Sequence, residues 1–158
     1  MLAQTPVQIA WVTRDLGATE RALSALVGAR KWVRMPGVHF APDTCTFRGE
    51  PADFTADISL SYAGDTQLEV IAPVTGDSIY TEFLNNAGAG LHHICMETDD
   101  MRRALDELDD EVVAGGVMPG GMEFAYVSAE AAGVPYIEIA YVPDEIRAFF
   151  DYVKQEQQ

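Results

Sequence analysis

The N-terminal part of the chain alternates polar and apolar residues and then changes to a helical pattern. "VQIAWVT", from Val7 to Thr13, alternates as a β-strand does. "DLGATERALSALVGA" follows, with apolar residues at helical spacing between Asp15, a suitable N-cap, and Gly28, a suitable stop. This stretch therefore predicts a strand followed by an amphipathic helix.

The same succession returns in the second half of the chain. "HICMET" alternates, Asp99 or Asp100 caps the next helix, and "MRRALDELDDEV" carries its apolar residues on one face. Strand pairs follow both helices: "ADISLSYAGDTQLEVIAP" turns at Gly64-Asp65, and "MEFAYVSAEAAGVPYIEIAYV" turns through a longer loop that ends at Gly133. The chain thus predicts an internal repeat of a strand, a helix and several strands.

Single elements connect and end the repeat. "DSIYTEFLNNAGAG" predicts a short linker helix, "PDEIRAFFDYVKQ" a terminal amphipathic helix, and "AGGVMPGG" (residues 114–121) a turn between helix and strand. We expect one domain over residues 1–158, with module one at about 5–73, the linker helix at about 77–87, module two at about 90–142 and the C-terminal helix at about 144–155.

Strand alternation places four polar side chains on the inner face of a curved sheet. These are Gln8, Glu69, His93 and Glu138, each in the middle of its strand and opposite an apolar face. Two glutamates and a histidine would cost several kcal/mol if they were buried without partners, so they need water, mutual pairing or a cation. Zn, Mn, Co, Ni or Fe suits such nitrogen and carboxylate ligands. A solvated polar pocket explains the same pattern.

Composition narrows the class of partner. The 158 residues are 48% apolar and have no apolar run near the ~20 residues of a membrane span. The two cysteines are too far apart in sequence for a zinc motif, and no leader pattern opens the chain, so we expect a cytoplasmic protein. A formal charge of −15 opposes nucleic acid and anionic membranes. Within this acidic background, a basic rim can form from Arg30, Lys31, Arg34 and Arg48.

"GLHHICMETDDM", "TQLEVIAPVTGDSIYTEFL" and "VPYIEIA" resemble the vicinal oxygen chelate superfamily of glyoxalases, bleomycin resistance proteins and dioxygenases, and are most similar to its methylmalonyl-CoA epimerase-like branch. The resemblance implies an α+β fold in which two tandem βαβββ modules form a cupped mixed sheet, with a short linker helix and a C-terminal helix. It also implies that Glu69, His93 and Glu138 are metal ligands. The fourth family ligand is a histidine, and Gln8, a weaker neutral donor, stands in its place.

The function that the resemblance implies is that of a metal-dependent isomerase or lyase, which moves a proton next to a metal-polarised carbonyl. Glu138 or Glu69 would act as both ligand and base. The epimerase branch also uses a carboxylate of the first module, and three residues compete for that role: Glu50, Asp53 and Asp57. The candidate lining of the substrate pocket is Trp32, Tyr62, Cys95, Glu97, Tyr126 and Tyr136.

Two other functions remain open from the sequence. A metal-free protein that binds or sequesters a small molecule or drug would use the same cup, and Gln8 favours this alternative. An extradiol-type Fe(II) dioxygenase is less well supported, because those enzymes use two histidines and one glutamate. In either case we expect a small-molecule partner and a homodimer, since a cupped sheet has edge strands that proteins usually cover.

Overall fold

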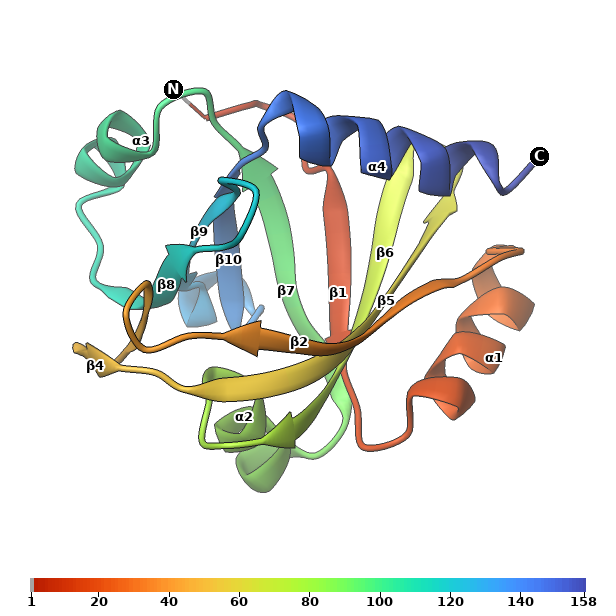
Figure 1. Ribbon diagram of the computed structural model, residues 1–158, viewed down its shortest axis with the longest axis horizontal. Helices are drawn as coiled ribbons and strands as arrows, with labels where there is room; N and C mark the ends of the chain where they lie inside the picture. The colour runs from red at the N-terminus through yellow and green to blue at the C-terminus, as the bar shows by residue number, and fades with distance from the viewer. Residues whose placement is uncertain (1) are drawn as a thin grey trace.

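The computed structural model describes residues 2–158 and confirms the α+β fold of two βαβββ modules in one curled mixed sheet (Figure 1). The first module contains β1 (Gln8–Val12), α1 (Leu16–Val27), β2 (Val33–Phe40), β5 (Phe54–Ala63) and β6 (Thr66–Thr75). The second contains β7 (Gly90–Glu97), α3 (Met101–Leu108), β8 (Val112–Val117), β9 (Glu123–Ser128) and β10 (Tyr136–Tyr141). Helix α2 (Ile79–Ala87) joins the modules and α4 (Asp144–Gln155) follows them.

The two modules meet where β1 pairs with β7. The strand order is β2-β5-β6-β1-β7-β10-β9-β8-β3-β4, and β1 is antiparallel to β7 with Ala10 opposite His93. Each of these two strands has a parallel neighbour from its own module, β6 beside β1 and β10 beside β7. The four central strands therefore come in equal numbers from both halves of the chain.

Side-chain caps fix where the helices begin. Asp15 accepts a hydrogen bond from the backbone N–H of Ala18 and Asp100 accepts one from that of Arg103, which confirms Asp15 as a cap and selects Asp100 over Asp99. Helix α2 begins at Ser78, whose hydroxyl and backbone form a reciprocal capping box with Thr81.

A short hairpin from the first module crosses to the edge of the second. Strands β3 (Cys45–Phe47) and β4 (Glu50–Pro51) lie between β2 and β5 in sequence, yet β3 pairs with β8 (Figure 1). The expectation of a turn over residues 114–121 was therefore wrong in its first part, which continues β8 to Val117. A Cβ on Gly116 would lie 2.5 Å from the backbone oxygen of Thr44, so glycine permits the approach of β3.

The covering helices differ in what they bury. Helix α2 sends Tyr80 against an aromatic cluster in which the rings of Phe40 and Phe54 stack at 4.4 Å. Helix α4 runs across the open side of the curled sheet, at the top of Figure 1. Among residues 2–158, no helix combines the length and the apolarity that crossing a membrane requires. The homodimer stays a prediction, although β3 already covers the edge of β8.

Replacing Gly116 with alanine tests the role of the β3–β8 contact. The added methyl group would overlap Thr44 and Cys45, so we expect Gly116→Ala to lower the free energy of unfolding by about 1–3 kcal/mol. Gly90→Ala is a matched control, because a Cβ there meets its nearest neighbour, Phe83, at 4.0 Å. Urea unfolding measures both variants, and equal losses would show that the close approach of β3 has no special cost.

Candidate functional site

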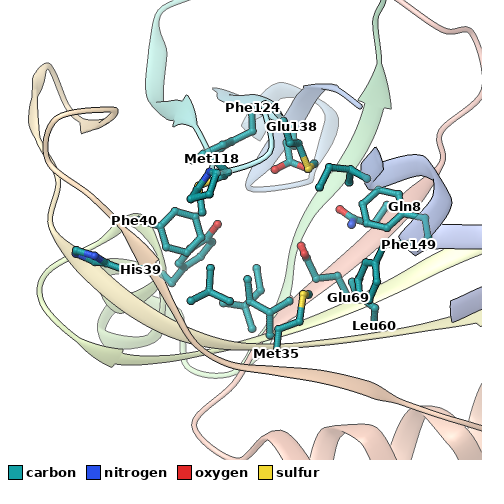
Figure 2. A pocket seen from close by; sticks show the side chains of 18 of the residues that line it. Gln8, Met35, His39, Phe40, Leu60, Glu69, Met118, Phe124, Glu138 and Phe149 are labelled. Atoms are coloured by element: carbon teal, nitrogen blue, oxygen red, sulfur yellow. The ribbon is translucent and has the colours of Figure 1, made fainter. Parts of the chain in front are cut away.

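A cavity of about 370 Å³ lies inside the curled sheet (Figure 2). Its wall is mainly apolar and rich in methionine and phenylalanine, including Met35, Phe40, Leu60, Met118, Phe124 and Phe149. The first three come from module one, Met118 and Phe124 from module two, and Phe149 from α4. This volume and lining are typical of a site for a small organic molecule.

Four polar side chains converge at one end of the cavity. The Nε2 atom of His93 lies 3.2 Å from Gln8 Oε1, 3.4 Å from Glu69 Oε1 and 3.7 Å from Glu138 Oε1. Figure 2 shows Gln8, Glu69 and Glu138 pointing into the cavity. The structure thus brings together the four residues that the sequence placed on the inner face.

Adjacent strands position these four residues. β6, β1, β7 and β10 are neighbours in the sheet, and each contributes one of the four. Glu69, His93 and Glu138 lie inside their strands, whereas Gln8, expected at mid-strand, is the first residue of β1. His93 is fully buried, and the Glu69 and Glu138 side chains are only 15% and 8% exposed. Since side chains alternate along a strand, a shift of one residue in register would turn any of them away from the cavity.

Within residues 2–158, no lysine or arginine lines the cavity beside the acidic groups of this cluster. Burial raises the pKa of Glu69 to about 7. Burial also raises the pKa of Glu138, and His93 partly opposes that change. The same desolvation lowers the pKa of His93, with Glu138 acting against it. Near neutral pH the cluster is therefore poised to hold or release protons.

Two tyrosines extend the polar end of the cavity. The hydroxyl groups of Tyr80 on α2 and Tyr126 on β9 lie 2.6 Å apart, and both residues line the cavity. A hydrogen bond from Tyr126 also opposes the rise in the pKa of Glu138. Tyr126 was a pocket candidate from the sequence. Tyr80 was missed, since its place in the linker helix gave no sign that it faces the cavity.

His92 lies beside His93 rather than on the opposite face of β7, because the pairing of β1 with β7 shifts register at this point, and its ring packs on Tyr80 and Tyr126 of the cavity wall. It is fully buried between aromatic rings, among them Phe83 of α2 at 5.1 Å. Its Nδ1 lies 2.8 Å from His93 Nδ1, and its Nε2 has no hydrogen-bond partner within the described residues. Burial lowers the pKa of His92 to about 2, so the ring is neutral. His92 therefore packs among aromatic rings next to His93.

Three other pocket candidates line a second, smaller cavity of about 150 Å³. Tyr62, Cys95 and Glu97 lie there, beside Gln8, which reaches both cavities. Glu97 forms an ion pair of 2.6 Å with Arg147 of α4. This group is thus next to the main cavity: Gln8 lines both cavities, and the Cys95 side chain also hydrogen-bonds with Glu138 of the four-residue cluster.

The remaining two candidates lie elsewhere. The indole Nε1 of Trp32 donates to Ser24 Oγ of α1, outside the sheet. The ring of Tyr136 packs on His92 at 5.0 Å and borders a surface hollow next to Arg48. Neither belongs to the wall of the main cavity.

The cavity wall includes residues that the sequence did not single out. Ile146, Phe149 and Phe150 of α4, together with Met118 and Met122, complete it. The apolar side of α4 was evident from its helical spacing. The spacing alone could not show that this side of α4 packs over the cavity.

The expected basic rim does not form at this cavity. Arg34 pairs with Glu20 of α1, and Arg48 pairs with Glu82 of α2. The two guanidinium groups therefore bind glutamates of two different helices, α1 and α2. No lysine or arginine of residues 2–158 lines the main cavity.

The three competing carboxylates of the first module also lie outside the cavity wall. Asp53 pairs with His39 at 2.7 Å, and Asp57 accepts a hydrogen bond from the backbone N–H of Gly37. Glu50 is exposed in β4. Among described residues, Glu69 and Glu138 are the carboxylates that face the cavity.

The four-residue cluster is not a preformed ion site. In the described part of the chain, no three or more His, Cys, Asp or Glu side chains already stand in an arrangement that would hold a metal ion. Two buried carboxylates without a cation repel each other, which favours a more open arrangement.

Fold and site together define a class: single-chain proteins in which two βαβββ modules enclose a cavity with a polar end made by the central strands. The profile of the Glyoxalase/Bleomycin resistance protein/Dioxygenase superfamily matches residues 7–126. The chain belongs to this family. The match includes Gln8, Glu69 and His93 and ends before Glu138.

Individual relatives are more distant. The mitochondrial methylmalonyl-CoA epimerase of Mus musculus is 39% identical over 46 residues, 28% of this chain and 26% of that protein, so the matched segment spans about a quarter of that relative. Among solved structures, a hypothetical protein from Bacillus halodurans has a TM-score of 0.64 at 14% identity, covering 89% of this chain and 95% of that one. Methylmalonyl-CoA epimerase from Mycobacterium tuberculosis has a TM-score of 0.61 at 16% identity, covering 94% and 97%. The two structures show the fold.

The raised pKa of Glu69 predicts how stability changes with pH. The folded state holds this proton up to pH about 7, whereas an unfolded glutamate releases it near 4.5. The contribution of Glu69 to stability is therefore full at pH 4 and falls as the pH rises to 8, by about 2–3 kcal/mol. Urea unfolding in a chelator should show this loss in the wild type and not in Glu69→Gln.

The control for that measurement is Glu50→Gln, at an exposed position of β4. It should keep the pH dependence of the wild type. If Glu69→Gln and Glu50→Gln unfold with the same pH dependence, folding does not raise the pKa of Glu69 and the prediction is wrong.

Proposed function

We propose that this protein is a metal-dependent isomerase or lyase of the vicinal oxygen chelate type, acting on a small molecule with a carbonyl group. The observation that carries the proposal is the convergence of Gln8, Glu69 and Glu138 on the Nε2 atom of His93 at the end of an apolar cavity. Family membership supports it, because members often bind divalent metals.

The donor set fits a divalent ion. It contains one imidazole nitrogen, one amide oxygen and two carboxylates, which suits Zn, Mn, Co, Ni or Fe. Glu69 and Glu138 are buried, and in the described cavity wall no cationic side chain neutralises them. A divalent ion would supply that charge and would polarise a substrate carbonyl.

The residues of this chain would move the proton. Glu69 and Glu138 approach His93 from β6 and β10, so a substrate carbon in the cavity can meet a carboxylate from either module. One carboxylate would take the proton at an oxygen atom and the other, or the same one, would return it.

The epimerases among the structural neighbours suggest epimerisation as the reaction, and the lining of the cavity limits which residues could carry it out. Epimerisation needs a proton to leave one face of a carbon and return to the other, and Glu69 and Glu138 are the available pair. The first-module carboxylates expected from the epimerase branch do not line the cavity, although Asp53 pairs with His39 of its wall. We therefore propose proton transfer by these two ligating glutamates.

A metal-free binding protein is the second candidate. The largely apolar wall favours it, as does Gln8, a weaker neutral donor than the histidine of the family pattern. In that case protonated Glu69, whose pKa is about 7, and the Tyr80–Tyr126 pair would donate hydrogen bonds to a captured molecule.

Metal content separates the two candidates. After dialysis against Mn, Co, Ni, Zn or Fe(II), we expect about one equivalent in the wild type by plasma mass spectrometry. His93→Ala and Glu138→Ala should lose it, because each removes a ligand, and both should remain folded by circular dichroism. The metal-loaded wild type should then exchange the α proton of carbonyl substrates with deuterium.

Gln8→His completes this experiment. Imidazole is the stronger donor for borderline metals, so this variant should bind metal at least as tightly as the wild type. No metal in the wild type together with metal in Gln8→His would reject the enzyme and favour the metal-free binder. Metal in all variants, His93→Ala included, would show that the site is elsewhere.

A further inference from the structure

The charges around the cavity restrict what can enter it. Phosphate groups are recognised by arginine or lysine donors, and within residues 2–158 neither residue type lines this cavity. The nearby cations are already paired: Arg34 with Glu20, Arg48 with Glu82 and Arg147 with Glu97. The chain also carries a formal charge of −15. The cavity is thus poorly suited to a phosphorylated ligand such as a coenzyme A ester.

The wall offers complementary chemistry for a different ligand. Phe40, Phe124 and Phe149 present ring surfaces, and Met35 and Met118 present flexible, polarisable side chains that adapt to flat groups. These five side chains form the methionine and phenylalanine chamber, and the cluster around His93 forms the polar end of the same cavity. A ligand with one carbonyl end and one aromatic end would match both parts.

We propose that the substrate of this site is an uncharged, mainly aromatic carbonyl compound without phosphate. The inference rests on the proposed function for the orientation of the carbonyl group toward Glu69 and Glu138. The aromatic part of the ligand would occupy the methionine and phenylalanine chamber beneath α4. Its recognition depends on apolar burial, so it does not require the metal.

Isothermal titration calorimetry with two probes tests this substrate class. The probes are 1-phenyl-1,2-propanedione, which is neutral and aromatic, and propionyl-CoA, which is highly charged. We expect the diketone to bind at least about tenfold more tightly, in metal-free as well as metal-loaded protein. Equal or tighter binding of propionyl-CoA, or no binding of the diketone, would overturn the proposal.

A pair of neighbouring variants locates the binding. Met118→Trp fills the cavity from its wall and should weaken diketone binding about tenfold or more. Val117→Trp adds the same bulk at a residue that is 42% exposed and lies outside the wall, and it should leave binding unchanged. Equal affinities in the two variants would place the diketone elsewhere. Because metal-free protein is used, this failure is distinct from a failure to bind metal.

A separate observation concerns Gln8. Its side-chain Nε2 donates to Gln67 Oε1 at 2.6 Å, and Gln67 Nε2 donates in turn to the Tyr62 hydroxyl at 3.1 Å. Both glutamines are buried, so these bonds are not exchanged for water. With its nitrogen held by Gln67, the Gln8 amide presents its oxygen to His93 Nε2.

The geometry also assigns Gln67 as a positioning residue that fixes which atom of Gln8 faces the site. Only the amide oxygen can ligate a cation, whereas a flipped amide would present its NH2 group. This assignment rests on the proposed metal site. Gln67 touches no substrate in it and acts through Gln8 alone.

Manganese affinity in a double-mutant cycle tests the assignment. Gln67→Leu keeps the size and removes the acceptor, and it should weaken Mn²⁺ binding about tenfold. Gln67→Glu keeps an oxygen acceptor for Gln8 Nε2 and should bind Mn²⁺ close to the wild-type level. In a Gln8→Ala background, Gln67→Leu should cause no further loss.

The outcomes distinguish this assignment from the proposed function. A wild type that binds Mn²⁺ with an affinity unaffected by Gln67→Leu overturns the positioning role alone. An equal loss in the Gln8→Ala background also overturns it, because Gln67 would then act independently of Gln8. A wild type with no Mn²⁺ affinity overturns the proposed function and the positioning role together.

Discussion

The antiparallel pairing of β1 with β7 is the contact on which the rest of the site depends. It joins two modules that would otherwise each hold half of a cup, and it sets Ala10 against His93 so that Gln8 and His93 reach the same point. Parallel neighbours on either side bring Glu69 and Glu138 to that point. A slip of one residue in this pairing would turn the side chains of one module outward and divide the cluster.

Burying the polar cluster destabilises the folded state, and the apolar wall around it does not offset this loss. Glu69 and Glu138 stay protonated further toward neutral pH than exposed glutamates because burial disfavours their charged form, and burial also lowers the pKa of His93 beside them. Natural sequences keep such groups where function needs them and recover stability from the surrounding core. The aromatic packing of Phe40, Phe54 and Tyr80 directly beside the cavity is that surrounding core.

The sequence predicted the repeated elements and the four inner-facing residues because both follow from local periodicity. Gln8, Glu69, His93 and Glu138 all lie within strands, Gln8 at the start of β1, where alternation decides the face. Trp32 precedes β2, where no alternation applies, and its indole bonds to α1. The cavity role of Phe149 and the pairing of β3 with β8 are contacts between distant segments, which no local pattern encodes.

The β3–β4 hairpin makes the two halves of the repeat unequal. It is made by the first half of the chain, yet its pairing partner, β8, belongs to the second. A fragment of the first half would carry a hairpin with nothing to pair with, and a fragment of the second would expose a bare strand edge. The halves therefore cannot be exchanged between two copies, as duplicated modules often can, without carrying this hairpin along.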